Sequence, residues 1–280
     1  MDLKSLLDTP PWDWPRDAGR LFLKILIDRR ANESDRLVAA TLGGDFTVIN
    51  DDLADALLSV VGSADEPERL RARAAISLGP VLDHVDTSGF EDPDDIPIIE
   101  RTFRNIQESF QKLYLDSSTP KEVRRRILEA SVRAPETWHQ DAIRNAYSRG
   151  DKEWTLTAVF AMRWVRGFDD QILAALKSTD SEIHYEAVNA AGNWELDAAW
   201  SHIVQLVEDT DTSRPLLLAA IRAAGSIRPA EARKVLAELA DSDDEEIAEA
   251  AEEAISMTEV ALDEDDEPLP SQHENNKWVN

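Results

Sequence analysis

The sequence contains no cysteine. This absence excludes disulfide bonds, thiolate metal sites and a cysteine nucleophile. No apolar run approaches the ~20 residues that a membrane-spanning helix needs. The N-terminus lacks the basic segment and apolar stretch of a secretory signal. We therefore expect a cytoplasmic protein that does not associate with membranes.

Basic residues are scarce relative to acidic ones. Lys and Arg total 30, Asp and Glu total 56, and the net charge is −26. Such a chain is repelled by DNA, RNA and anionic membranes, so we expect no nucleic-acid partner. Residues 241–270 hold 14 acids and no base, which is more than half of the net charge. Solubility or high-salt adaptation is the simplest explanation, and an acidic tail that binds a partner is the alternative.

Motifs of common catalytic sites are also missing. The sequence has no phosphate-binding glycine loop, P-loop or GxSxG elbow. His184, Tyr185 and Glu186 are adjacent acid–base candidates, but in a helix each residue points about 100° away from the next. We therefore predict no catalytic residue, no metal ligand and no cofactor, and a protein that is not an enzyme.

The chain does contain a repeat. Each copy has an apolar residue four positions after its start, Ala, Ser or Thr at seven, and in four copies glycine at nine. Positions zero, four, seven and eight share one helix face. The glycine predicts a left-handed residue that ends this helix. A second helix follows each copy, so the unit is a helix pair of about 31 residues. The copies start at Ser34, Leu70, Val123, Trp154, Ile183, Leu216 and Ile247.

The motifs LRARAAISLG (from Leu70), IHYEAVNAAG (from Ile183) and LLLAAIRAAG (from Leu216) resemble short HEAT repeats of the phycobilisome-lyase type. The resemblance implies an all-α solenoid of about seven helix pairs over residues 15–258. Residues 1–14 are expected to cap its N-terminal end, with Trp12 and Trp14 covering the first helix. Residues 259–280 are expected to form an acidic tail without fixed structure.

An insertion interrupts the period around residues 84–117. Its first part, HVDTSGFEDPDDIP, predicts an acidic loop, and its second part predicts a long helix. The loop acids Glu91, Asp92, Asp94 and Asp95 do not have the spacing of an EF-hand. Insertions in solenoids often gather on a functional face, and harmless elongation is the equal alternative.

In HEAT solenoids the helix that carries this pattern lines the concave side, so the resemblance implies that positions two, three and six face a groove. The groove is expected to be basic in its N-terminal half, apolar and aromatic in the middle, and acidic at its C-terminal end. We expect a monomeric scaffold or adaptor that binds a protein segment with acidic and hydrophobic residues. The alternative is that these side chains are solvated or pair with nearby acids, as Arg126 could with Glu129. The candidate contacts are Arg36, Arg73, Arg125, Arg126, Phe160, Tyr185, Glu186, Asn189 and Arg222.

Three activities known on HEAT-like folds are alternatives to this expectation. Hydroxylases hold iron with paired His–Glu dipeptides, but only His273–Glu274 matches. DNA glycosylases use tryptophans in a basic groove, whereas Trp154 falls on a core position and the net charge opposes DNA. A bilin lyase or chaperone shares the repeat, but no residue here singles out a tetrapyrrole. The glycosylase and the bilin lyase or chaperone remain the alternative functions.

Overall fold

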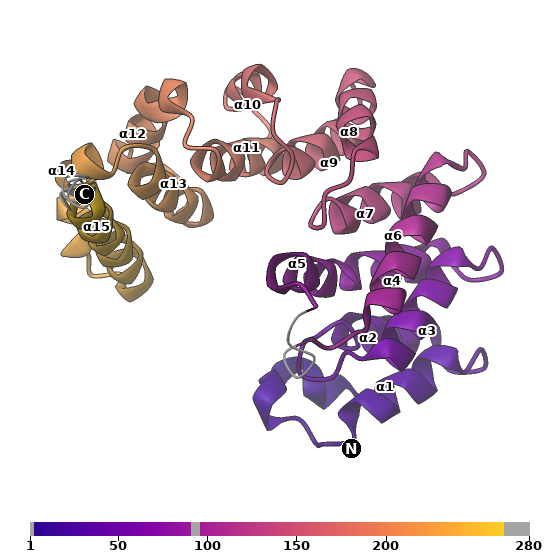
Figure 1. The fold of residues 1–280 in the computed structure, drawn as a ribbon. Helices are drawn as coiled ribbons and strands as arrows, with labels where there is room; N and C mark the ends of the chain where they lie inside the picture. Colours follow the sequence, from indigo (N-terminus) through magenta and orange to yellow (C-terminus); the bar gives the residue numbers. More distant parts are fainter. Residues whose placement is uncertain (1–2, 91–95, 266–280) are drawn as a thin grey trace, which may run out of the picture. The chain divides into compact units, whose positions relative to one another are not determined.

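The computed structural model describes residues 3–90 and 96–265, and these ranges contain helices and no strand (Figure 1). The chain divides into two compact units, Met1–Gly167 (unit 1) and Phe168–Asn280 (unit 2). Each unit consists of helix pairs, and we call the first helix of a pair the A helix and the second the B helix. The predicted all-α repeat fold is confirmed.

Unit 1 contains four helix pairs in its described part. Its B helices contact one another in chain order, from α2 to α4 to α7 to α9, and the additional helix α5 follows the second pair. The A helices are α1 (Ala18–Ile27), α3 (Asp51–Gly62), α6 (Glu100–Leu115) and α8 (Trp138–Ser148). The B helices are α2 (Glu33–Leu42), α4 (Glu68–Ser77), α7 (Lys121–Ser131) and α9 (Lys152–Met162), and α5 spans Gly79–Ser88.

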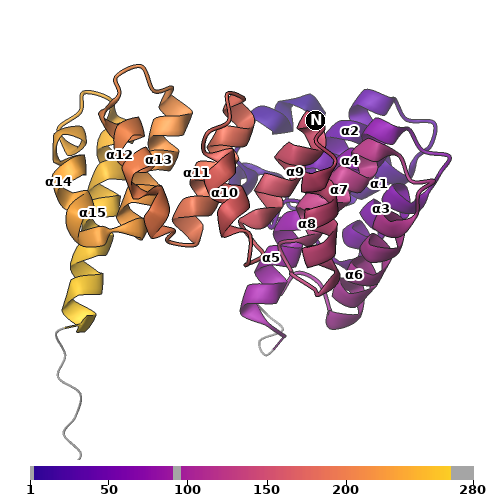
Figure 2. The same cartoon turned by 90° about the horizontal axis from the view of Figure 1, so that it is seen from above.

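Unit 2 contains three pairs in its described part (Figure 2). Its A helices are α10 (Asp169–Ala175), α12 (Trp200–Glu208), preceded by the 3-10 turn η3 (Asp197–Ala199), and α14 (Pro229–Ala240). Its B helices are α11 (Ser181–Asn193), α13 (Arg214–Ile227) and α15 (Glu245–Asp265). Helix α15 includes residues 259–265, which the sequence placed in the tail, and residues 266–280 lie outside the described residues.

Polar side chains at the turns explain where several helices begin. Asn50 accepts a hydrogen bond from the Leu53 N–H at the start of α3, and Asp151 accepts one from the Trp154 N–H at the start of α9. Asp180 accepts from the N–H groups of Glu182 and Ile183 at the start of α11. These caps bond backbone N–H groups that have no partner inside the helix.

None of the four repeat glycines has the predicted left-handed conformation, although Gly43 does follow the last residue of α2, so this part of the prediction is wrong. Gly192 lies inside α11 and Gly225 inside α13. A Cβ added at Gly192 would stand 2.8 Å from Ala223 Cα, and one at Gly225 would stand 3.0 Å from Ala254 Cβ. Ala223 and Ala254 occupy position seven of the following copies, so the glycine lets successive B helices touch through their backbones.

Three arginines fasten B helices to the A helices before them. Arg71 Nε donates to Val61 O at 2.9 Å, and Arg124 Nε donates to Tyr114 O at 2.8 Å. Arg36 donates to Leu26 O at 3.0 and 2.9 Å. Each bond reaches back ten residues, so Arg36 is equivalent to the other two arginines. The first copy therefore starts at Asp35 rather than at Ser34.

The N-terminal segment and the insertion differ from expectation in detail. The 3-10 helix η1 (Leu3–Asp8) contacts α2, and η2 spans Pro11–Asp13. Trp14 packs edge-on against Phe22 at 5.4 Å, whereas Trp12 is 79% exposed and covers nothing. The long helix of the insertion is α6, but part of the expected loop is the C-terminal half of α5. The four loop acids lie in residues 91–95, outside the described residues.

Candidate functional site

Two adjoining troughs cross the B helices of unit 1. One lies between η1, α2 and α4, has a volume of about 570 Å³, and includes Leu7, Leu37 and Val38 in its lining. The other lies between α4 and α7, has a volume of about 590 Å³, and includes Ala72 and Ile76. Arg69 and Arg73 line both troughs. We call these two arginines the α4 ridge.

The guanidinium groups of the α4 ridge are unpaired. Both residues are exposed, they lie one helical turn apart, and neither guanidinium has a hydrogen bond or ion pair within the described residues. Glu33 and Glu68, in the first turns of α2 and α4, also line the troughs but bond neither arginine. In a chain of net charge −26, these two arginines place positive charge side by side between the two troughs. They are free to receive an acidic group from outside.

Arg36 does not face a groove, and its prediction as a partner contact is corrected. It is 5% exposed, and besides Leu26 O it bonds the carboxylate of Glu66 at 2.6 and 2.9 Å. The hydrogen bond from Arg36 lowers the pKa of Glu66. With the register that begins at Asp35, Leu37, Val38 and Thr41 take the outward positions of α2. All three line the first trough.

Arg125 is also buried, and its prediction as a contact is corrected too. Its guanidinium donates to Thr157 Oγ1 at 2.9 Å and to Glu122 at 2.8 Å. Thr157 in turn donates to Glu129 Oε1 at 2.6 Å. These bonds fasten α7 to α9. The guanidinium of Arg125 is therefore hydrogen-bonded within the protein rather than directed toward a partner.

Arg126 lines the second trough but is paired, which is the alternative that the sequence left open. It bonds Glu122 at 2.8 Å and Glu129 at 2.5 Å. Of the predicted arginines in unit 1, Arg73 alone is an exposed trough residue without a partner among the described residues. Arg69 escaped prediction because it precedes the repeat start by one position. Its spacing of four residues from Arg73 was the signal that could have found it.

The remaining predicted contacts lie on later helices. Phe160, on α9, is half-buried under the guanidinium of Arg133, whose carbon is 5.8 Å from the ring centre. Tyr185, Glu186 and Asn189 are half-buried on α11 of unit 2, and the Asn189 amide donates to Tyr185 O at 2.9 Å. Arg222 is exposed on α13. None of these residues lines the two troughs.

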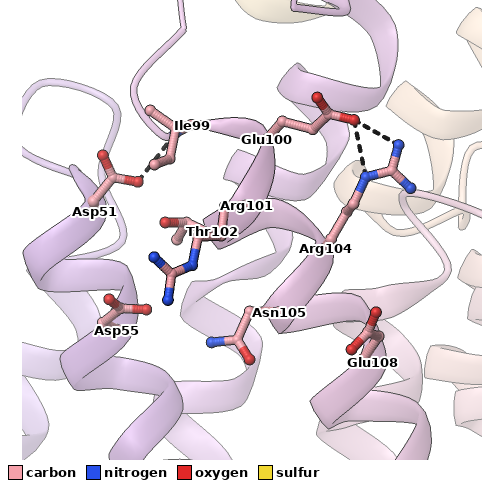
Figure 3. Close-up of a pocket in the computed structure, with 9 residues that line it drawn as sticks. All are labelled: Asp51, Asp55, Ile99, Glu100, Arg101, Thr102, Arg104, Asn105 and Glu108. Carbon is pink, nitrogen blue, oxygen red and sulfur yellow. Dashed lines mark hydrogen bonds and ion pairs between the residues drawn. The ribbon is translucent and has the colours of Figure 1, made fainter.

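A further pocket of about 800 Å³ lies on the A helices, between α3 and α6 (Figure 3). Figure 3 shows Arg101 extending from α6 toward Asp55 on α3. Asp51 accepts the Ile99 N–H at 3.0 Å, and Glu100 pairs with Arg104 at 2.5 Å. Much of the polar lining of this pocket is therefore already hydrogen-bonded or ion-paired within the protein. The pocket is open, and its lining carries charges of both signs.

His139 and Ser131 form a serine–histidine pair inside the protein. His139 Nε2 lies 2.9 Å from Ser131 Oγ, and His139 Nδ1 lies 2.8 Å from the Glu136 nitrogen and 3.1 Å from Glu136 O. Burial lowers the pKa of His139 to about 4. Ser131 is 3% exposed and His139 is fully buried, so a substrate has no access to the hydroxyl. The pair is structural.

A family model described as HEAT repeats matches residues 169–256. This segment of the chain carries HEAT repeats. No curated protein matches the chain by sequence. Within the described residues, no helix combines the length and apolar character needed to cross a membrane.

Solved structures with a similar arrangement of HEAT-like helices share little sequence with the chain. YibA from Escherichia coli is 18% identical, with 89% of this chain and 84% of that chain covered and a TM-score of 0.46. Human deoxyhypusine hydroxylase in complex with glycerol is 16% identical, with 88% and 97% covered and a TM-score of 0.38. An engineered protein is 21% identical, with 87% and 97% covered and a TM-score of 0.34.

The prediction that the chain is not an enzyme, which rested on the absence of common catalytic motifs, is corrected. Deoxyhypusine hydroxylase, by its name an enzyme, is among the solved proteins with similar helical repeats. At 16% identity the likeness concerns the fold alone and assigns no reaction to this chain.

Proposed function

We propose that this helical repeat scaffold binds a protein segment across α2, α4 and α7 of unit 1, and that the segment carries acidic and apolar side chains. The observation that carries the proposal is the α4 ridge. Within the described residues, Arg69 and Arg73 are unpaired, and they are exposed between two troughs that have apolar residues in their lining. Arginine is enriched in binding hot spots, and it receives carboxylates through two parallel hydrogen bonds.

The lining of the troughs defines the chemistry of the partner. Leu7 is 50% exposed, and it stands beside Leu37 and Val38 in the first trough. Ala72 and Ile76 line the second. A partner that bonds the α4 ridge with its carboxylates can therefore place apolar side chains on either side. Glu33 and Glu68 in the same lining disfavour a segment that is acidic throughout.

A peptide-display selection on the immobilised full chain tests this proposal. We expect enrichment of sequences that combine Asp or Glu with large apolar residues. For a selected peptide, Arg69→Glu/Arg73→Glu should weaken binding about tenfold or more, measured by fluorescence anisotropy, because two attractive contacts become repulsive.

The matched control is Arg20→Glu. Arg20 is an exposed residue of α1, outside both troughs, and the substitution reverses one arginine charge, which is half of the change in the ridge variant. It should leave the affinity within about twofold of the wild type. Enrichment of basic peptides, or equal binding to the ridge variant and the wild type, would refute the proposal.

A further inference from the structure

Two histidines of unit 2 face each other across neighbouring helices. His184 lies on α11 and His202 on α12, and their Nε2 atoms are 2.8 Å apart. The ring centres are 5.0 Å apart and the ring planes make an angle of 59°. Both side chains are half-buried, so solvent reaches the pair. The whole chain has five histidines, and two of them meet here.

The position of His184 in the repeat makes this contact informative. His184 occupies position one of its copy, where Arg71 and Arg124 bond a carbonyl ten residues earlier. His184 instead contacts His202, on the A helix that follows α11. The residue at position one thus joins α11 to the next helix rather than to the preceding one. An imidazole offers a lone pair there, which a guanidinium cannot do.

The two Nε2 atoms are as far apart as two adjacent ligands of a metal ion, although ring centres 5.0 Å apart show that each Nε2 now points toward the other ring. Imidazole suits Cu²⁺, Ni²⁺ and Zn²⁺, and Cu²⁺ and Ni²⁺ favour square-planar arrangements. With bonds of about 2.0 Å, adjacent ligands of a square-planar ion lie about 2.8 Å apart, whereas tetrahedral Zn²⁺ separates them by roughly 3.3 Å. We propose that His184 and His202 form a two-imidazole site for Cu²⁺ or Ni²⁺ that links α11 to α12.

The protonation state of the pair suits this role. Burial and the neighbouring His202 lower the pKa of His184, and burial and Lys177 lower the pKa of His202. Both rings are therefore neutral at pH 7, as metal ligands must be. Binding replaces the hydrogen bond between the rings, turns both lone pairs toward the ion and places both ring protons on Nδ1. A neutral pair releases no net proton.

Two neighbouring features set the limits of the site. Among the described residues, no further His, Asp or Glu groups with the pair into a set of three or more, so water or an outside ligand fills the other coordination positions. The positive charge of Lys177 acts on His202 and opposes a bound cation. Lys177→Gln should therefore tighten binding by roughly threefold.

Titration of the full chain with Ni²⁺ in a non-chelating buffer at pH 7.5, followed by calorimetry, tests the site. We expect one ion per chain. His184→Asn and His202→Asn should each weaken this binding about tenfold or more, because each removes one of the two ligands. His84→Asn is the matched control, a half-buried histidine of unit 1, and it should leave binding unchanged. Circular dichroism checks that each variant is folded.

A spectroscopic measurement on the wild type makes the test independent of variant stability. With one equivalent of Cu²⁺, the electron paramagnetic resonance spectrum should show coupling to two imidazole nitrogens. The proposal is overturned if the wild type shows no saturable binding up to about 1 mM Ni²⁺. It is equally overturned if both histidine variants bind as the wild type does, or if the Cu²⁺ spectrum lacks two coupled imidazoles.

Discussion

At the scale of single residues, the contact between glycine and alanine decides how closely the B helices stack. Gly192 meets Ala223 and Gly225 meets Ala254, always from position nine of one copy to position seven of the next. The sequence indicated that these columns hold small residues. It could not say why, because a glycine that ends a helix and one that touches a neighbouring backbone look alike until the next helix is placed.

Gly192→Ala should destabilise the protein by about 1–3 kcal/mol, because the added methyl group overlaps the backbone of α13. Gly62→Ala is the control. Gly62 ends α3 with no atom within 4 Å of an added Cβ, so the change should be neutral or stabilise by up to ~1 kcal/mol. Urea denaturation of both variants measures the difference. Equal effects would mean that the contact does not determine helix spacing.

At the scale of helices, the arginine bonds explain how an A helix is joined to its B helix. The last carbonyls of a helix have no partner within it. Arg36, Arg71 and Arg124 supply charged donors to Leu26, Val61 and Tyr114 at the ends of α1, α3 and α6. The alignment of the copies by apolar residues alone placed Arg36 one position too far outward. The ten-residue spacing of these bonds corrects the alignment.

Arg71→Ala should cost about 2–3 kcal/mol of unfolding free energy, because it removes a buried hydrogen bond with a charged donor and leaves Val61 O unbonded by that side chain. Arg69→Ala is the control on the same helix. Its guanidinium has no partner within the described residues, so the change should stay within about 0.5 kcal/mol. Urea denaturation distinguishes the two. A costly Arg69→Ala would show that the α4 ridge has a structural role.

The candidate site was only partly predictable at this scale. Arg73 was predicted as an outward residue, and it is one. The sequence pattern did not distinguish Arg125 from Arg73. The burial of Arg125 depends on Thr157 and Glu129, which cover its guanidinium. Pattern positions describe which way a side chain leaves its own helix. They do not include the neighbouring helix that pairs with it or covers it.

At the scale of the whole chain, the repeat period was enough to predict the fold. All seven predicted starts lie at or next to B helices, with the first displaced by one residue. The division after Gly167 was not predicted, because the period continues across it with little change. Helix α5 was also missed, since its second half, from Asp83 to Ser88, is polar and reads as a loop.

Salt should stabilise the chain as a whole. The net charge of −26 makes the folded state repel itself, and raising NaCl shortens the screening length from about 10 Å at 0.1 M to about 3 Å at 1 M. We expect the melting temperature to rise by about 3–6 °C between these concentrations. Glycerol at equal osmolality is the control. A fall would show that exposed ion pairs, such as Lys121 with Asp151 and Arg214 with Asp244, contribute more than the repulsion.

The backbone contact between α11 and α13 also has a mechanical consequence. Where side chains separate two helices, bending is absorbed by changes of rotamer, but Gly192 and the Ala223 Cα offer no rotamer to change. Motion that brings α11 and α13 closer at this point is resisted by steric overlap of their backbones. Motion that separates the two helices is opposed only by the loss of dispersion contacts and by hydration of the exposed surfaces. The contact between α11 and α13 should therefore resist compression more strongly than it resists separation of the two helices.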